Sequence, residues 1–182
     1  MAAVKEATKR FRLGYVADPL PGHDMYKGML AIPYLRRSDD GDWSVVSLRF
    51  RCIEEHEHIG HGKYNTMPGD RVRLFNTFAL LKPNTRMLVT EGEIDAITAT
   101  VFGYDAVAVP GSSSWQPHFR EPLLGYDTVY VVADGDDAGK KFANTVAQSL
   151  PNAKIILCPD GEDVNSWITN REGFQQFKER IK

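Results

Sequence analysis

The chain has 182 residues, a formal net charge of −2, 42% hydrophobic residues and 25% charged residues. These values are ordinary for a soluble protein with one full hydrophobic core, or one domain with a smaller appendage. They exclude a membrane protein, because no apolar run reaches membrane-spanning length and the charged N-terminus has no signal core. The two cysteines, Cys52 and Cys158, lie far apart, so we expect free thiols and a cytoplasmic protein.

Charge is distributed unevenly between the two halves of the chain. Residues 1–86 hold 14 Lys and Arg against 10 Asp and Glu, whereas residues 87–182 hold 8 against 14. The change coincides with a change of pattern, so we predict a basic N-terminal subdomain, 1–86, and an acidic metal-binding domain, 87–182. A basic lobe joined to a metal-binding lobe fits a polyanionic substrate. Chance asymmetry of a solvated surface is the alternative.

The first half of the chain contains a β-hairpin pattern. Apolar strands are predicted over residues 28–37 and 43–53, separated by a turn rich in Asp and Gly. Pro33 predicts that the first strand lies at a sheet edge or carries a bulge. Arg49 and Arg51 alternate with apolar residues, so both point to one face of the second strand. They are either a phosphate-binding pair or the wet side of a half-buried sheet.

A polar stretch rich in histidine follows the hairpin. Cys52, His56, His58 and His61 have side chains that bind zinc. Their spacing, C-x3-H-x-H-x2-H, is not a common structural zinc pattern, and no second ligand pair follows downstream. We therefore interpret the stretch as a solvated loop.

Cations surround a tyrosine in the next loop, which spans residues 62–70 and contains Pro and Gly. Lys63 and Tyr64 lie within it, and Arg71 and Arg73 come directly after it. Cations suit phosphate contacts and the ring suits base stacking, so this composition predicts a nucleic-acid or nucleotide contact.

The second half alternates between strand and helix patterns. Four strands separated by crossover connections predict an α/β domain with a parallel sheet flanked by helices and right-handed connections. The predicted strands are residues 87–90, 106–109, 128–133 and 153–158. The predicted helices are residues 93–102, 117–124, 136–150 and 171–182.

Carboxylates follow two of these strands where each strand ends. Glu91 follows the first strand, and Asp134 and Asp136 follow the third. The carboxyl ends of strands are where open α/β sheets bind ligands, so we expect these acids to meet. Oxygen-only ligands select Mg²⁺ or Mn²⁺, which serve phosphate chemistry. We predict that the three acids are catalytic and hold the ion.

Further residues around the acids extend the predicted site. Asp163, in the loop 159–165, is a candidate ligand for a second metal. Gly92, Gly135 and Gly139 are expected to let the backbone approach a phosphate closely.

Two motifs carry a family resemblance. Thr90-Glu-Gly-Glu-Ile-Asp95 followed by Ala133-Asp-Gly-Asp-Asp-Ala-Gly139 resembles the Toprim domain of bacterial-type primases, topoisomerases and some nucleases. Together with the segment 157–165, the hairpin and Lys63, the motifs resemble the RNA-polymerase core of DnaG-type bacterial and bacteriophage primases. Asn165 stands where that family often has an Asp.

The resemblance implies the chemistry of a DNA primase. The chain is expected to be a nucleotidyltransferase that makes RNA primers on single-stranded DNA from nucleoside triphosphates, using Mg²⁺ or Mn²⁺. Asp95 is expected to bind metal or to support the site, and Lys63 to face template and nucleotide. The family's zinc module and helicase parts are missing, so a separate zinc-binding or helicase protein is an expected partner. For a phage-encoded chain the location is the host cytoplasm.

Two alternatives remain open from the sequence. A Toprim-type metal-dependent nuclease would use the same acids to activate water, although such enzymes begin with the Toprim strand near the N-terminus. A non-catalytic replication module would bind DNA and keep the metal for structure.

Overall fold

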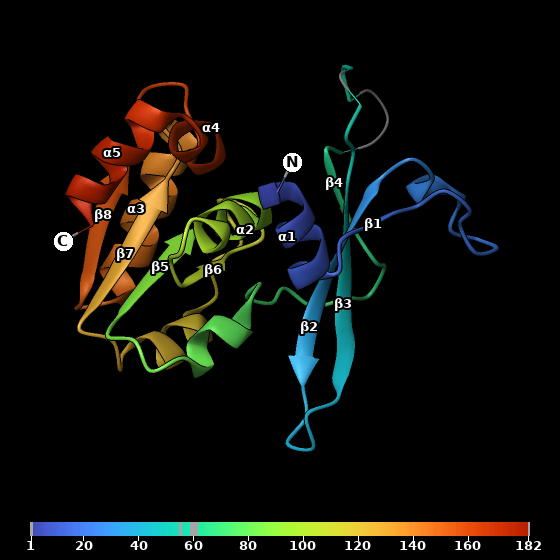
Figure 1. The fold of residues 1–182 in the computed structure, drawn as a ribbon, viewed down its shortest axis with the longest axis horizontal. Coiled ribbons are helices and arrows are strands. Elements are labelled where there is room, and N and C mark those ends of the chain that lie inside the picture. The colour runs from blue at the N-terminus through green and yellow to red at the C-terminus, as the bar shows by residue number, and fades with distance from the viewer. Residues whose placement is uncertain (1, 55, 59–61, 182) are drawn as a thin grey trace. The chain divides into compact units, whose positions relative to one another are not determined.

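The computed structural model describes residues 2–54, 56–58 and 62–181. Two units, Met1–Arg71 and Val72–Lys182, each contain a four-stranded sheet (Figure 1). No helix in the described ranges has both the length and the apolar character needed to cross a membrane.

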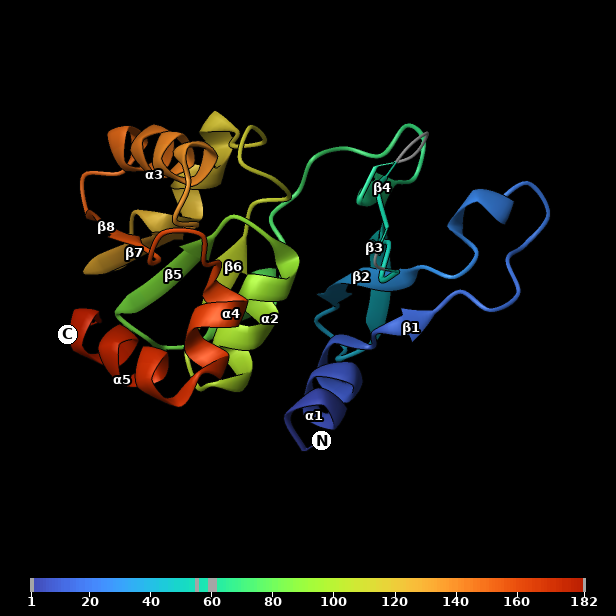
Figure 2. The same cartoon turned by 90° about the horizontal axis from the view of Figure 1, so that it is seen from above.

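The sheet of the first unit is antiparallel, and its strands run in the order β1-β2-β3-β4 (Figure 2). The two central strands form the predicted hairpin, which is confirmed. Around them lie the helix α1 and the 3₁₀ turn η1. The elements are α1 (Ala2–Phe11), β1 (Gly14–Tyr15), η1 (Asp24–Tyr26), β2 (Leu30–Arg37), β3 (Trp43–Arg51) and β4 (Tyr64–Thr66).

The position of Pro33 in β2 fits the prediction of an edge or a bulge. The short strand β1 pairs only with Leu30 and Ala31, so Pro33 lies beyond its reach. The register between β2 and β3 then shifts between Tyr34 and Leu35. A residue without an N–H group is tolerated where the ladder is already incomplete.

A small aromatic core lies on one face of this sheet. The rings of Tyr26 and Phe50 stack with centroids 3.9 Å apart, and Met29 and Cys52 are buried with them. Because side chains alternate along β3, the burial of Phe50 places its neighbours Arg49 and Arg51 on the other face.

The sheet of the second unit is parallel, as predicted, with the strand order β6-β5-β7-β8. From β5 the chain crosses to β6 on one side, and from β7 it crosses to β8 on the other. Right-handed crossovers in opposite directions place α2 and α3 on opposite faces, as Figure 2 shows. The strands are β5 (Arg86–Thr90), β6 (Ala106–Ala108), β7 (Thr128–Ala133) and β8 (Ala153–Leu157).

The helices of the second unit bury the sheet from both sides. Helix α4 packs against α2 and α5, while α3 packs on β7 and β8. The central strands β5 and β7 are buried after their first residues, which is expected for a parallel sheet covered on both faces. The elements are η2 (Thr77–Leu81), α2 (Glu93–Val101), η3 (Pro117–Leu123), α3 (Asp137–Ser149), α4 (Val164–Thr169) and α5 (Arg171–Arg180).

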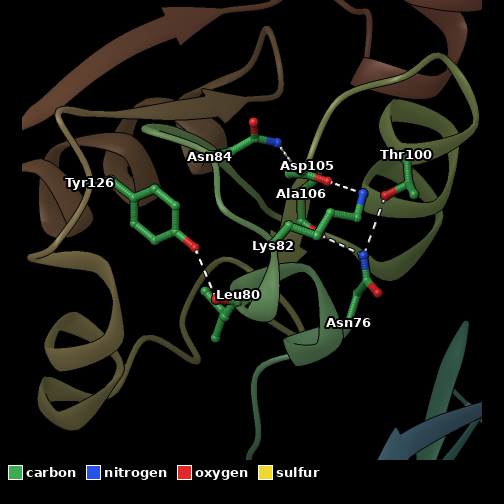
Figure 3. A network of polar contacts seen from close by, with 8 residues as sticks. All are labelled: Asn76, Leu80, Lys82, Asn84, Thr100, Asp105, Ala106 and Tyr126. Atoms are coloured by element: carbon green, nitrogen blue, oxygen red, sulfur yellow. Dashed lines mark hydrogen bonds and ion pairs between the residues drawn. The ribbon is translucent and has the colours of Figure 1, made fainter.

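Residues 72–86, which the sequence assigned to the basic half, pack with the second unit. Phe75 forms a two-bond antiparallel bridge with Ala108 at the end of β6. The segment is also held by polar side chains (Figure 3): Asn76 donates to the Ala106 carbonyl at 2.7 Å, and Lys82 and Asn84 both contact the buried carboxylate of Asp105. The compact units thus divide between Arg71 and Val72, while a functional division after residue 86 stays a prediction.

Candidate metal centre and cationic face

The carboxyl ends of β5 and β7 form the switch point of the parallel sheet. The two strands are neighbours, and the chain leaves them in opposite directions. Open α/β sheets bind ligands at such a point, because the loops that follow the two strands separate there. Glu91 follows β5 directly, and Asp134 and Asp136 follow β7.

Glu91 is half-buried and lies within the field of the two aspartates. Burial, followed by the negative charges of Asp134 and Asp136, raises the pKa of Glu91 from 4.5 to about 7. Hydrogen bonds from the Ser112 side chain and the Asp134 backbone oppose this shift. Oxygen Oε2 of Glu91 is buried, with no hydrogen-bond partner in the described part of the chain. A buried carboxylate oxygen without a hydrogen-bond partner is a candidate ligand atom for a cation.

Asp136 begins helix α3 and has a structural role of its own. As the N-cap residue, it accepts a hydrogen bond through Oδ1 from the backbone N–H of Gly139 at 2.7 Å. The residue is exposed, and its second carboxylate oxygen is not needed for this cap. One side chain can thus cap the helix and contribute an oxygen to an ion.

Asp95 and Asp163 extend the acidic cluster on the side of α2 and α4. Burial, then the charges of Asp163 and Asp134, raise the pKa of Asp95 from 3.8 to about 8. Asp163 caps α4 and accepts a hydrogen bond from the Ser166 N–H at 2.6 Å. The side-chain amide oxygen of Asn165 accepts a hydrogen bond at 2.8 Å from the hydroxyl group of Thr98, which lies in α2.

Two of the three predicted glycines, Gly135 and Gly139, lie so close to backbone atoms that a side chain would not fit. A Cβ atom at Gly135 would lie 1.9 Å from the Pro159 carbonyl oxygen, and one at Gly139 would lie 2.3 Å from the Asp134 carbonyl oxygen. A Cβ atom at Gly92 would lie 2.8 Å from a carboxylate oxygen of Asp95. These approaches hold the acidic loops together, and the phosphate-approach role of the glycines stays a prediction.

The acidic cluster fits a hard divalent cation. Its donors are all carboxylate oxygens, one of them buried without a partner, and two of its carboxyl groups have pKa values raised by burial and then by neighbouring negative charges. In the described ranges, no three of these acids bring ligand atoms within 4.8 Å of one another. Mg²⁺ tolerates such spacing because it keeps several of its waters. The residues that would hold the ion are Glu91, Asp134, Asp136, Asp163 and Asp95.

Two further residues, which the sequence did not predict, lie beside this cluster. Ser112 donates a hydrogen bond to Glu91, and the Ser-rich start of the connection after β6 was the available signal. Cys158 is buried, and burial followed by the charges of Asp134, Asp95 and Asp163 raises the pKa of its thiol. A lone cysteine after a strand gave no signal for its place among the acids.

Arg49, Arg51 and Tyr64 form a cationic face on the sheet of the first unit. Arg51 pairs with Tyr64 across β3 and β4, and Arg49 pairs with Thr66. The guanidinium carbons of Arg49 and Arg51 lie 5.0 Å and 5.5 Å from the centre of the Tyr64 ring. The predicted common face of the two arginines is confirmed, and the ring stacks with both of them.

The remaining predicted cations lie at three different places. Lys63 is exposed directly before β4, and Arg71 is exposed at the end of the first unit. Arg73 is half-buried and belongs to the second unit. Their roles in binding nucleic acid stay predictions.

The histidine-rich stretch differs from the solvated loop that the sequence favoured. Cys52, His56 and His58 bring one ligand atom each within 4.8 Å of one another. The spacing did not predict this cluster, because it arises where β3 ends and the chain turns back on itself. His61 lies outside the described residues.

The second unit matches a known family. A family model described as Toprim-like matches residues 88–168, a range that contains all five acids of the cluster. The chain is 52% identical over 157 residues to the Gene 57 protein of Mycobacterium phage D29, which covers 86% of this chain and 100% of that protein.

Bacterial primases are more distant relatives. The chain is 34% identical over 122 residues to the DNA primase of Buchnera aphidicola subsp. Acyrthosiphon pisum, covering 61% of this chain. That alignment spans only 21% of the primase, so the chain corresponds to about a fifth of its length.

Solved structures extend the likeness to the whole chain. A DNA primase domain from Pseudomonas aeruginosa superposes with a TM-score of 0.74 at 22% identity, covering 100% of this chain and 71% of that one. The primase fragment of the bacteriophage T7 primase-helicase gives a TM-score of 0.71 at 20% identity, covering 98% and 69%. The resemblance of the two acidic motifs is thereby confirmed: residues 88–168 match the Toprim-like family, and the chain belongs to one family with the Gene 57 protein and has the fold of the DnaG-type primase catalytic core.

Proposed function

We propose that this chain is the catalytic core of a DNA primase, a metal-dependent nucleotidyltransferase that makes RNA primers on single-stranded DNA. The observation that supports the proposal is that Glu91, Asp134 and Asp136 follow the neighbouring strands β5 and β7 at the switch point of the sheet, where the charges of both aspartates act on Glu91. The partners are a single-stranded template and nucleoside triphosphates, and a separate zinc-binding or helicase protein assists template selection.

The acidic residues would bind Mg²⁺ or Mn²⁺. When bound, the ion neutralises triphosphate charge and activates a 3′-hydroxyl group. Glu91, Asp134 and Asp136 would provide the main oxygens, and Asp163 and Asp95 would provide the oxygens nearest α4. Because Glu91 carries a proton below a pH of about 7 and Asp95 below a pH of about 8, the metal-free site is fully ionised only above neutral pH.

The cationic face would bind the polyanionic nucleic acid or nucleotide. Arg49 and Arg51 offer planar donors suited to phosphate, and Tyr64 offers a ring beside them on which a base can stack. Exposed Lys63 directly precedes that ring and adds a point charge. The contacts expected here are to the backbone and to base faces, so they carry little sequence preference.

Relatives of the same fold support the assignment of nucleic acid as the substrate. A DnaG primase catalytic domain whose structure is described as bound to single-stranded DNA superposes with a TM-score of 0.70. Primase domains described as bound to an RNA/DNA hybrid, in a complex with the bacteriophage T7 lagging-strand DNA polymerase, superpose with a TM-score of 0.71.

A template assay tests the proposal. The protein is incubated with single-stranded DNA, labelled ribonucleotides and Mn²⁺, and the products are separated by length. New short oligomers that disappear in Asp134→Asn and in a chelator are the expected result. Shortening of the template would instead identify a Toprim nuclease, and binding with neither product would identify a non-catalytic module.

A further inference from the structure

A second group of metal-ligating side chains lies in the first unit. The ligand atoms of Cys52, His56 and His58 all lie within 4.8 Å of one another. The sulfur of Cys52 is 4.0 Å from Nε2 of His56, and the rings of the two histidines have centroids 4.9 Å apart. None of these residues belongs to the carboxylate cluster.

These spacings are close to those of a tetrahedral zinc site. With zinc–sulfur and zinc–nitrogen bonds of about 2.3 Å and 2.0 Å, sulfur and nitrogen ligands are separated by about 3.5 Å. The observed 4.0 Å is therefore only slightly wider than a loaded site requires. Small side-chain movements bring the three ligand atoms onto one ion, and water can take the fourth position.

A carboxylate on the far side of His56 completes a recurring arrangement. Oε2 of Glu54 lies 3.8 Å from Nδ1 of His56, while Nε2 of the same ring faces the Cys52 sulfur. Metal-ligating histidines commonly direct their second ring nitrogen to a carboxylate, which fixes the ring orientation and strengthens the ligand. Glu54 thus lies on the side of His56 that the carboxylate of such a triad occupies, and a small movement of its exposed side chain would bring it within hydrogen-bond distance.

The cluster of Cys52, His56 and His58 lies next to the cationic face, at the end of β3. Cys52 follows β3 directly, and its backbone N–H donates to the Lys63 carbonyl at 2.9 Å. The next pair along the sheet is Arg51 with Tyr64. An ion on Cys52 would therefore tie the end of β3 beside the residues that are candidates for contact with nucleic acid.

We propose that Cys52, His56 and His58 form a structural zinc site that anchors the end of β3 and orders Lys63 and Tyr64. Thiolate and imidazole ligands select zinc over magnesium, so this site is chemically distinct from the carboxylate cluster. On binding, Cys52 releases its thiol proton to solvent, the hydrated ion exchanges water ligands for one sulfur and two ring nitrogens, and no oxidation state changes.

Cobalt substitution of the 182-residue chain tests the proposal. The protein is stripped with a chelator and titrated with Co²⁺ in the presence of excess Mg²⁺, which occupies the carboxylate cluster. The expected result is one equivalent of tetrahedral Co²⁺ with a sulfur-to-cobalt charge-transfer band, displaced by stoichiometric Zn²⁺. Absence of that band in the folded protein would overturn the proposal.

Variants assign the signal to the named ligands. Cys52→Ser should remove the charge-transfer band, whereas Cys158→Ser should keep it. Loss of an outer partner alone weakens metal sites by about 10–100-fold, so the ligand change His56→Asn should weaken zinc binding by more than about 100-fold. His118→Asn, in the second unit, should leave zinc affinity unchanged.

A folding control keeps the variants interpretable. Cys52 is buried, so circular dichroism must verify that its variant folds, whereas His56 is exposed and its replacement should be tolerated. Zinc affinity unchanged in folded His56→Asn, or a charge-transfer band that persists in folded Cys52→Ser, would exclude these ligands.

Discussion

The carboxylate of Asp95 accepts a hydrogen bond from the backbone N–H of Asn165 at 3.1 Å, joining the first turn of α2 to the first turn of α4. Because the donor belongs to the backbone, this bond does not depend on the side chain at position 165. The Asn165 amide oxygen instead accepts from Thr98. The departure from an aspartate at position 165 therefore leaves the support of Asp95 intact, and it removes one negative charge from a crowded cluster.

Asp95 should make the metal-free protein less stable as pH rises. Its pKa is 3.8 in the unfolded chain and about 8 in the folded protein, so between these values only the folded state keeps the proton. The free energy of unfolding therefore falls as pH rises through this window. Asp95→Asn should make the free energy of unfolding depend less on pH and should stabilise the protein at pH 9 by on the order of a few kcal/mol. Urea unfolding in the presence of a chelator at pH 5, 7 and 9 measures this free energy.

A matched control separates this effect from a general change in charge. Glu121→Gln removes an exposed carboxylate from the same unit, and its unfolding curves should follow those of the unchanged protein at every pH. If Asp95→Asn also follows them, the buried charge of Asp95 is not a source of the pH dependence.

Glu91 should make metal binding strengthen as pH rises. Its pKa of about 7 means that a bound ion must displace the proton of Glu91 at pH 6, whereas Glu91 is already ionised at pH 8. We expect the apparent affinity for Mn²⁺ to increase by at least about tenfold between these values. Calorimetry in two buffers of different ionisation enthalpy also reports the released proton. Equal affinities at pH 6 and pH 8, with no proton release, would contradict this role for Glu91.

Asp136 has a helix-capping role that can be separated from its metal role. Asp136→Asn keeps an oxygen that can accept from the Gly139 N–H, whereas Asp136→Ala removes it. We expect the asparagine variant to melt near the unchanged protein, and the alanine variant to lose about 1 kcal/mol of stability. Both variants should lose metal-dependent primer synthesis. Thermal melts run beside the template assay measure the two effects, and full synthesis by either variant would remove Asp136 from the site.

The sequence predicted the parallel half of the fold well, because its signals are local. Apolar runs that end in acids, followed by helical periodicity, placed Glu91 and Asp134 at strand ends, and parallel strands bring such ends to one edge. The same alternation along β3 placed Arg49 and Arg51 on one face. These features depend only on the period of a strand and the handedness of its connections.

The remaining features depend on contacts between distant residues, which no local pattern reveals. Residues 72–86 join the second unit through the Phe75–Ala108 bridge and the buried Asp105, none of which a charge count detects. The Cys52 cluster arises because the chain turns at the end of β3, and its spacing resembled no common zinc motif. The sequence did not reveal that Asp136 and Asp163 cap helices, because aspartate is common both as an N-cap residue and as a metal ligand.

Lys63 should contribute a salt-dependent share of nucleic-acid binding. It is exposed directly before Tyr64, so Lys63→Ala removes one cation without disturbing a core. Binding to single-stranded DNA should weaken, and the slope of log affinity against log salt should become shallower by about 0.7. Fluorescence anisotropy between low and moderate salt measures both. Lys5→Ala, on helix α1, is the control cation, and equal slopes for the two variants would make Lys63 an ordinary surface charge.

Gly135 should be the glycine of the acidic loops whose loss costs the most stability. A Cβ atom there would lie 1.9 Å from the Pro159 carbonyl oxygen and 2.9 Å from that of Cys158, so the clash is with backbone that cannot rotate away. The backbone N–H of Gly135 also donates to the Glu162 carbonyl at 2.9 Å, which ties the loop after β7 to the loop after β8. Gly135→Ala must separate these loops, and we expect a loss of more than about 2 kcal/mol in the free energy of unfolding.

Gly125→Ala is the matched control for Gly135→Ala. No atom lies within 4 Å of a Cβ added at Gly125, so the substitution should change the unfolding midpoint in urea little. Metal binding separates the two variants further, because displaced loops carry Asp134 away from Glu91 and should weaken Mn²⁺ affinity only in Gly135→Ala. If both variants unfold at the same urea concentration and bind Mn²⁺ equally, the close packing of the two loops is not what holds the acids together.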